Sequence, residues 1–174
     1  MAFIKTLKGF TPKFGSGCFL SDTAVIIGDV IMGDNCSIWF NSVIRGDVHS
    51  IRMGNKVNVQ DGAVIHCTYR KAPVKIGNNV SIAHNAVVHG CTVHDNVLIG
   101  MGAIIMDHAV IESNSVIAAG AVVMENTMVE SGSVYAGIPA RKVKTIDKSL
   151  PEGQIDRIAD SYLIYAGWYK NEQT

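Results

Sequence analysis

The sequence predicts an all-β fold, a parallel β-helix followed by a C-terminal α-helix, and three observations lead to this prediction. A large apolar residue recurs at every sixth position over most of the chain, and a mostly small residue follows each one four positions later. After residue 141 this pattern stops, and a helical pattern follows it. A period of six fits neither the 3.6-residue turn of a helix nor the two-residue alternation of a long strand, but it fits a short strand and a corner that repeat. Three such units make one triangular coil.

The repeat is most regular in the second half of the chain. The large residues there are Val93, Ile99, Ile105, Ile111, Ile117, Val123, Val129 and Tyr135. The same register runs upstream through Leu20, Ile26, Met32, Ile38, Ile44, Met53, Val59, Ile65, Ile76, Ile82 and Val88. Insertions before Met53 and between Ile65 and Ile76 interrupt it, and insertions in a solenoid project from its corners as loops. We therefore expect the β-helix to span about residues 12–140.

A C-terminal helix is expected over about residues 150–170. The segment Ser149–Glu152 has the pattern of a capping box with proline in the first turn. An apolar stripe follows at helical spacing, formed by Ile155, Ile158, Ala159, Tyr162, Leu163 and Ala166. We expect this stripe to pack along an outer face of the β-helix. The aromatic residues of the helix are interpreted as packing groups: Tyr162, Tyr165, Trp168 and Tyr169. Helix and β-helix together make a single domain, residues 1–174.

Composition excludes several classes of function. Fifteen basic and fifteen acidic residues cancel, and no cluster of Lys or Arg stands out, so no nucleic-acid partner is expected. No run of 18 apolar residues occurs and the N-terminus lacks the pattern of a signal peptide, so no membrane association is expected. The four cysteines form no CxxC pair and are interpreted as reduced thiols. We expect a cytoplasmic protein that acts on a small molecule.

Two histidines and an arginine are predicted to stack in one outward column of the β-helix. Arg45, His66 and His89 each directly follow a large residue of the same face. Successive coils of parallel strands lie about 4.8 Å apart. This spacing suits two imidazoles that share a tetrahedral zinc ion with bonds of roughly 2.0–2.1 Å.

His84 falls on a different face of the coil that carries His89. Five extended residues span up to about 16 Å, so one chain would strain to bring both rings to one ion. A cyclic trimer solves this problem, because it sets one face of each chain against another face of the next and creates three equivalent sites. Asp61 lies one coil below His84, just as Arg45 lies one coil below His66, so these two opposite charges would also meet across the interface.

The alternative for any single histidine is an exposed surface side chain without a functional role. His49, His94 and His108 fall outside the matched columns, and we interpret them in this way.

At these residues the sequence resembles the gamma-class carbonic anhydrases, over about residues 10–140. The motifs that carry the resemblance are Ile44-Arg-Gly-Asp-Val48, Asn58-Val-Gln-Asp-Gly62, Ile65-His66, Ala83-His84 and Val88-His-Gly-Cys91. The resemblance implies a left-handed coil, which is an exception to the right-handed crossover rule. It also implies a homotrimer that reversibly hydrates carbon dioxide to bicarbonate, by metal-bound hydroxide at the subunit interface.

The resemblance further implies a role for each matching residue. The implied metal ligands are His66, His84 and His89. The implied catalytic residues are Asn58 and Gln60, and Gln60 orients the hydroxide. Arg45 and Asp61 form the implied interfacial ion pair, and Asp47 lies near the site. Zinc is the expected metal, and iron and cobalt also accept three imidazole ligands.

Two departures from the family pattern predict a slow enzyme. The segment Cys67–Val74 is short and contains no acid, where the archetypal enzyme carries a long acidic loop with a proton-shuttling glutamate. Val48 stands where the archetype has a second glutamate. Because proton removal then depends on buffer, activity is expected to be low.

Two other functions stay open at this point. The missing glutamates are compatible with a metal-binding or scaffold protein that has little catalytic activity. A hexapeptide-repeat acyltransferase also works between the subunits of a trimer, but it uses a histidine base and needs no metal. A stoichiometric metal assay separates the second alternative from the anhydrase.

Overall fold

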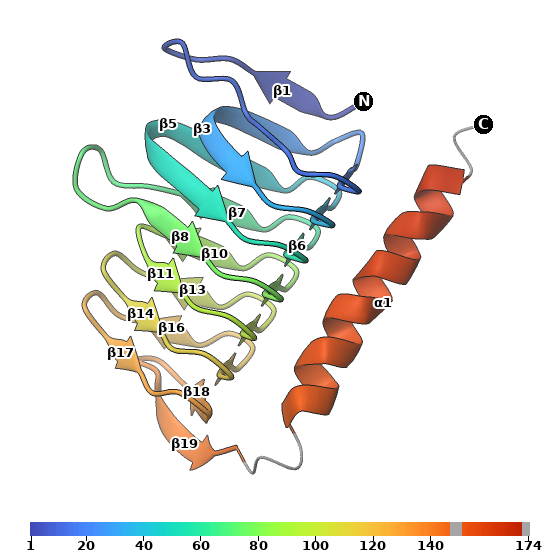
Figure 1. Cartoon of the computed structure of the whole chain (residues 1–174). Helices are drawn as coiled ribbons and strands as arrows, with labels where there is room; N and C mark the ends of the chain where they lie inside the picture. The colour runs from blue at the N-terminus through green and yellow to red at the C-terminus, as the bar shows by residue number, and fades with distance from the viewer. Residues whose placement is uncertain (147–150, 172–174) are drawn as a thin grey trace.

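A triangular stack of short parallel strands makes up most of the chain, and the long helix α1 (Pro151–Asn171) runs along its outside (Figure 1). The computed structural model describes residues 1–146 and 151–171. The predicted fold class, a parallel β-helix with a C-terminal helix, is confirmed. The start of the predicted capping box, Ser149, lies outside the described residues.

The strands belong to two sheets, and all pairs of neighbours are parallel except β18 with β19. The eleven-stranded sheet contains β1 (Phe3–Lys5), β3 (Val25–Met32), β5 (Val43–Met53), β7 (Val64–His66), β8 (Val74–Ile76), β10 (Val87–His89), β11 (Thr92–Val93), β13 (Ile104–Ile105), β14 (Val110–Ile111), β16 (Val122–Val123) and β17 (Met128–Val129). The eight-stranded sheet contains β2 (Phe19–Leu20), β4 (Ser37–Ile38), β6 (Asn58–Val59), β9 (Ser81–Ile82), β12 (Leu98–Ile99), β15 (Val116–Ile117), β18 (Ser133–Ala136) and β19 (Arg141–Thr145). The long strand β5 pairs with both β7 and β8, so it turns one corner of the triangle and joins two of its faces.

The six-residue repeat sets the register between hydrogen-bonded strands of successive coils. Val59 pairs with Ile82, and Ile99 pairs with both Ile82 and Ile117, so residues of the repeat lie directly above one another. The large repeat residues are completely or almost completely buried, except the partly buried Leu20, and form one continuous core. At the corners most of the non-glycine residues with left-handed φ are asparagines, the residue that adopts this conformation most readily after glycine.

Helix α1 packs against the eight-stranded sheet with part of its predicted stripe. Ile155, Ala159 and Ala166 are buried, whereas Leu163 is exposed, because the helix touches the sheet along a narrower line than predicted. Lys56 Nζ lies 2.6 Å from a carboxylate oxygen of Asp160, which ties the helix to a corner of the β-helix. Among the described residues, no helix combines the length and apolarity needed to cross a membrane.

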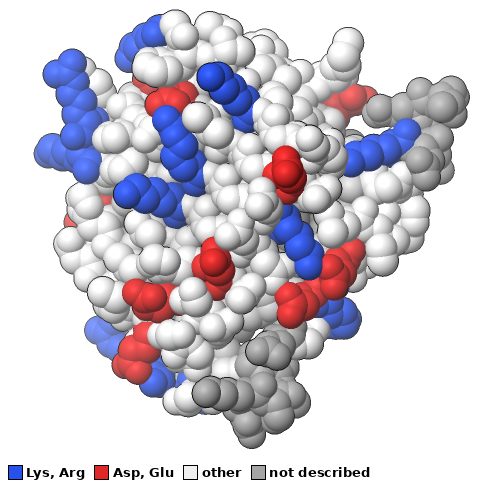
Figure 2. Space-filling model, viewed as in Figure 1, with Lys and Arg blue, Asp and Glu red and all other residues white. Residues whose placement is uncertain are grey.

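Acidic and basic side chains are interspersed over the face shown in Figure 2. Basic side chains gather toward the upper left of that view, over the loops at that side of the β-helix.

Candidate metal centre

Three stacked strands place the predicted column of Arg45, His66 and His89. Strand β5 pairs with β7 so that Arg45 lies beside His66, and β7 pairs with β10 so that His66 lies beside His89. Because the ladder fixes this register through backbone hydrogen bonds, the side chains of adjacent coils leave the sheet side by side.

The two imidazole rings of the column face each other. Nδ1 of His66 lies 3.1 Å from Nε2 of His89, and the ring centres are 5.1 Å apart. The opposite nitrogen of each ring contacts a carboxylate: Nε2 of His66 lies 3.0 Å from Asp47, and Nδ1 of His89 lies 2.5 Å from Asp107. Each carboxylate therefore holds a ring proton on the outer nitrogen and leaves the inner nitrogen with its lone pair.

His84 lies after β9 and has the same kind of environment. Its Nδ1 contacts Asp61 at 2.9 Å, and Asp61 belongs to the coil below, as predicted from the repeat. Its Nε2 lies 3.4 Å from the hydroxyl of Tyr162, which comes from helix α1. All three predicted ligands thus have one nitrogen held by a carboxylate and one nitrogen available to another partner.

This environment fits a metal ion. Histidine ligands of metals usually donate their other ring N–H to a carboxylate or carbonyl, which fixes the ring and its tautomer. Two nitrogens bound to one tetrahedral zinc ion at roughly 2.0–2.1 Å lie about 3.3 Å apart, close to the 3.1 Å between His66 and His89. In the part of one chain that the structure describes, no three His, Cys, Asp or Glu side chains are grouped to hold a metal ion. His84 does not join the other two within a single chain.

Comparison with known proteins assigns the family. Residues 11–46 and 90–125 match the family model described as bacterial transferase hexapeptide (six repeats). A carbonic anhydrase of Geobacillus kaustophilus is 40% identical over 94% of this chain and 88% of its own length. The mitochondrial gamma carbonic anhydrase 2 of Arabidopsis thaliana is 39% identical over 78% of this chain, and the match spans about half of that relative, 51%. This chain belongs to the gamma carbonic anhydrase family.

Solved structures of high similarity have different descriptions. A crystal structure from Bacillus cereus, described as a putative acetyltransferase, superposes with a TM-score of 0.93 over 99% of both chains at 35% identity. The gamma carbonic anhydrase fold is therefore shared with proteins described as transferases. The function has to be inferred from the residues of the site and not from the fold.

Gln60 and Asn58, the predicted catalytic residues, are buried and joined by a short polar chain. Nε2 of Gln60 donates to Oδ1 of Asn58 at 2.9 Å, and Nδ2 of Asn58 donates to Oγ of Ser81 at 2.7 Å. The sequence places Gln60 directly before Asp61, so both residues belong to the half of the site that contains His84. This chain of hydrogen bonds fixes the orientation of the Gln60 amide.

The predicted ion pair of Arg45 with Asp61 is not made within one chain. Arg45 instead pairs with Asp47 at 2.5 Å, because side chains two residues apart on a strand point to the same side. Asp61 pairs with His84. A contact between Arg45 and Asp61 across an interface stays a prediction.

Charges and burial keep the column in the form that binds metals. Burial lowers the pKa of His66 and the charge of Arg45 lowers it further, which outweighs the opposite effect of the hydrogen bond to Asp47, so the neutral ring is favoured. Burial tends to raise the pKa of Asp47, but hydrogen bonds from Arg45 and His66 outweigh it, and the pKa lies below its ordinary value. For Asp107, hydrogen bonds from Thr68 and His89 outweigh burial in the same way.

Sequence reasoning missed two residues of the site, Asp107 and Tyr162. Asp107 stands two positions after the repeat residue Ile105, and an acid at that distance from the column was the available signal. Tyr162 packs edge-on against Trp39 with ring centres 5.2 Å apart, as the apolar stripe predicted, but its hydroxyl also reaches His84.

Proposed function

We propose that this protein is a metal-dependent carbonic anhydrase, a lyase that reversibly hydrates carbon dioxide to bicarbonate at the interfaces of a homotrimer. The observation that carries the proposal is the shared environment of His66, His84 and His89, each held by a carboxylate on one nitrogen. The family relatives named carbonic anhydrase support the same reaction.

The three histidines would hold zinc, and iron or cobalt would also be accepted. A zinc ion bound by three neutral imidazoles lowers the pKa of a water molecule from 15.7 to about 7, which makes hydroxide available at neutral pH. In the trimer, His66 and His89 come from one subunit and His84 comes from the next. The cyclic arrangement supplies the third ligand that a single chain does not bring to the pair.

The surrounding residues hold the histidines in the reactive form. Asp47 keeps a proton on Nε2 of His66, and Asp107 and Asp61 keep protons on Nδ1 of His89 and His84. The amide of Gln60, oriented by Asn58, still has its oxygen to accept a hydrogen bond from the attacking oxygen. Gln60 therefore orients the nucleophile toward carbon dioxide.

Removal of the product proton is expected to limit turnover. The loop that replaces the acidic loop of the archetype is closed by a bridge between Thr68 and Ala72, and its tip carries Tyr69 and Arg70 but no acid. Without an internal carboxylate in this loop, the proton leaves directly to buffer. All four cysteines are free thiols, which supports the cytoplasmic location included in this proposal.

Metal analysis and a carbon dioxide hydration assay on one preparation test the proposal. The metal-loaded protein should hydrate carbon dioxide at a rate that rises with imidazole buffer concentration and then levels off. His66→Ala should abolish the activity, whereas Gln60→Ala should lower it without releasing metal. His94→Ala is the matched control, because it removes a surface imidazole outside the column.

Two results would overturn the proposal. A metal-loaded trimer without hydration above background at any buffer concentration would favour the scaffold function. A protein that binds no stoichiometric metal would favour the transferase function suggested by the description of its structural neighbour.

A further inference from the structure

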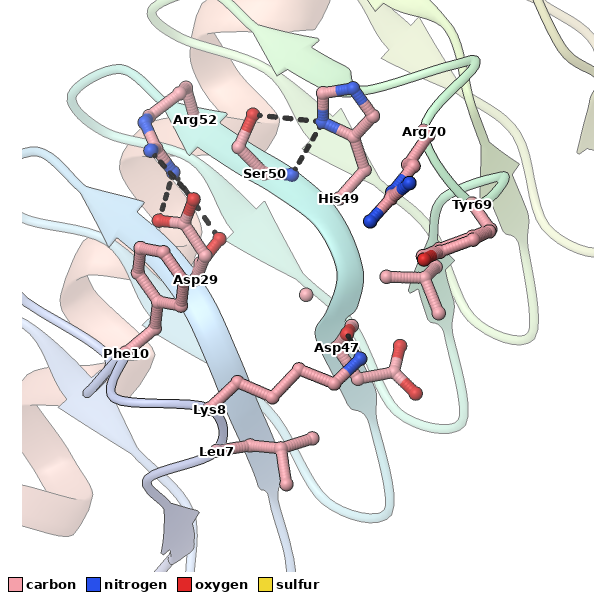
Figure 3. A pocket seen from close by; sticks show the side chains of 12 residues that line it. Leu7, Lys8, Phe10, Asp29, Asp47, His49, Ser50, Arg52, Tyr69 and Arg70 are labelled. Atoms are coloured by element: carbon pink, nitrogen blue, oxygen red, sulfur yellow. Dashed lines mark hydrogen bonds and ion pairs between the residues drawn. The ribbon is translucent and has the colours of Figure 1, made fainter.

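A cavity of about 630 Å³ lies beside the His66 half of the metal centre. Four segments of one chain line it: the N-terminal residues 7–10, Asp29 of β3, residues 46–52 of the long strand β5, and the tip of the loop at Tyr69 and Arg70 (Figure 3). One wall includes Asp47, the carboxylate that contacts His66. No residue of the eight-stranded sheet or of α1 lines it.

The acidic groups of the cavity are already neutralised. Asp29 pairs with Arg52, whose two terminal guanidinium nitrogens lie 2.8 and 3.0 Å from the carboxylate oxygens of Asp29 (Figure 3). Asp47 pairs with Arg45. Neither carboxylate is therefore free to balance a further cation.

Two cations of the cavity have no carboxylate partner among the described residues. Lys8 Nζ donates to the backbone oxygen of Asp47 at 3.3 Å and keeps two further N–H groups. The guanidinium of Arg70 lies 4.9 Å from the ring centre of Tyr69 and points into the cavity in Figure 3. Lys8 and Arg70 therefore give the cavity a net positive charge that an anion would compensate.

His49, interpreted from the sequence as a surface residue, adds a third donor. Its Nδ1 accepts a hydrogen bond from the backbone N–H of Ser50 at 2.8 Å, so the ring proton lies on Nε2. Figure 3 shows the ring on the Arg70 side of the cavity. Donors from three segments thus line the same cavity.

The rest of the lining is apolar and aromatic. Leu7, Phe10 and Tyr69 contribute to the wall, and the Phe10 and Tyr69 side chains are about half exposed. Sites for small molecules commonly have volumes of about 300–1,000 Å³ and combine such apolar walls with a few polar groups. Bicarbonate has neither the size nor the apolar surface to fill this cavity.

We propose that this cavity binds a small organic carboxylate with a flat apolar body, at a site separate from the metal ion. Lys8 and Arg70 would bind the carboxylate, while Phe10 and Tyr69 would contact the body of the ligand. The proposal does not depend on anhydrase activity, because the cavity contains none of the metal ligands.

Hydrogen bonds connect this site with the metal centre on two sides. Asp47 lines the cavity and also contacts His66. The loop that carries Arg70 is anchored where Thr68 donates to Asp107, and Asp107 contacts His89. A ligand that moves either segment would therefore change the environment of a metal ligand.

Titration calorimetry with benzoate tests the proposal on the full chain, both metal-loaded and stripped of metal by a chelator. Benzoate should bind in both forms, at one site per chain. Benzamide, which has the same body without the charge, should bind at least tenfold more weakly. Inorganic phosphate and bicarbonate, which lack the body, should also bind more weakly than benzoate.

Variants locate the site. Arg70→Gln and Lys8→Gln should each weaken benzoate binding roughly tenfold or more, because each removes a charged hydrogen bond. Lys71→Gln is the matched control, since it removes a positive charge from the same loop without touching the cavity. As a second measurement, the ring protons of Phe10 and Tyr69 should shift in the NMR spectrum with the same saturation curve.

The proposal is overturned if benzoate binds only the metal-loaded form, because binding would then be to the metal. It is also overturned if benzamide or phosphate binds as tightly as benzoate, or if Lys71→Gln weakens binding as much as Arg70→Gln.

Discussion

Nδ1 of His66 and Nε2 of His89 face each other at 3.1 Å, while the opposite nitrogen of each ring contacts a carboxylate. If Asp47 and Asp107 each hold a ring proton on the outer nitrogen, both inner nitrogens present lone pairs. Two lone pairs at this distance repel each other unless a cation lies between them. The geometry of His66 and His89 therefore fits a shared metal ion better than it fits a hydrogen bond between two neutral rings.

The first prediction concerns the carboxylate behind His89. Asp107→Asn should lower the affinity for zinc about 10- to 100-fold, because it removes the charge that fixes the ligand ring and raises its basicity. Competition with a chromophoric chelator measures the affinity. Asp95→Asn is the control, because the Asp95 side chain accepts hydrogen bonds only from Asn78, at an exposed corner. Equal affinities of both variants and the wild type would show that Asp107 does not support a ligand.

The repeat predicted the column of histidines because a period of six fixes both register and direction. It did not predict Asp107 or the pairing of Arg45 with Asp47. Asp107 lies one residue past the column position on the next coil, and Asp47 lies two residues past Arg45, so a comparison of equivalent positions in successive coils does not consider either residue. Arg45 and Asp47 are two residues apart on one strand, so their side chains leave the sheet on the same side.

The contact of Tyr162 with His84 could not be predicted from the six-residue repeat or from the apolar stripe of the helix. The apolar stripe of the helix shows which side faces the sheet, but not where along the β-helix it lies. That position depends on long-range contacts, such as the packing of Ala166 with Phe19 and Trp39. A hydroxyl at the edge of the stripe therefore reaches the site only because of tertiary packing.

Tyr162→Phe is the second prediction. Burial raises the pKa of Tyr162 to about 12, so the phenol stays protonated at ordinary assay pH. The hydroxyl contacts Nε2 of His84, the nitrogen that would bind the metal, so its loss should raise the affinity for zinc roughly 2- to 10-fold, the effect of about one hydrogen bond lost from the metal-free protein. Competition with a chromophoric chelator measures this affinity. The free energy of unfolding should change little, because the ring still packs on Trp39. Tyr165→Phe, an exposed neighbour, is the control, and equal zinc affinities of both variants would exclude a role of the Tyr162 hydroxyl at His84.

The third prediction concerns the four thiols. A hydrogen bond from Cys36 lowers the pKa of Cys18 to about 6, whereas burial raises the pKa of Cys67 to about 11 and that of Cys91 to about 12. The thiolate is the reactive form, and Cys18 is also the least buried of the four. At pH 7 iodoacetamide should therefore modify Cys18 first, as mass spectrometry of peptides would show. The rate should fall as the pH drops below about 6, and modification of Cys67 first would contradict the prediction.

The last prediction tests whether the site is shared between subunits. His66→Ala and His84→Ala homotrimers should each lack a complete site. In a mixture of the two chains, a complete site forms wherever the chain with His66 and His89 intact lies next to the chain with His84 intact. Random assembly with one fixed direction around the ring gives this arrangement at about one quarter of the interfaces. Coexpressed chains should therefore recover about a quarter of the wild-type metal content and hydration rate.

A second mixture controls for recovery by other means. His66→Ala and His89→Ala remove ligands from the same column of the same face, so no interface between these chains can contain all three histidines. This mixture should recover neither metal nor activity, although its chains assemble in the same proportions. If the site were formed within one chain, neither mixture would recover. Recovery in both would mean that His66 or His89 is dispensable, and the assignment of the column as a metal centre would then be wrong.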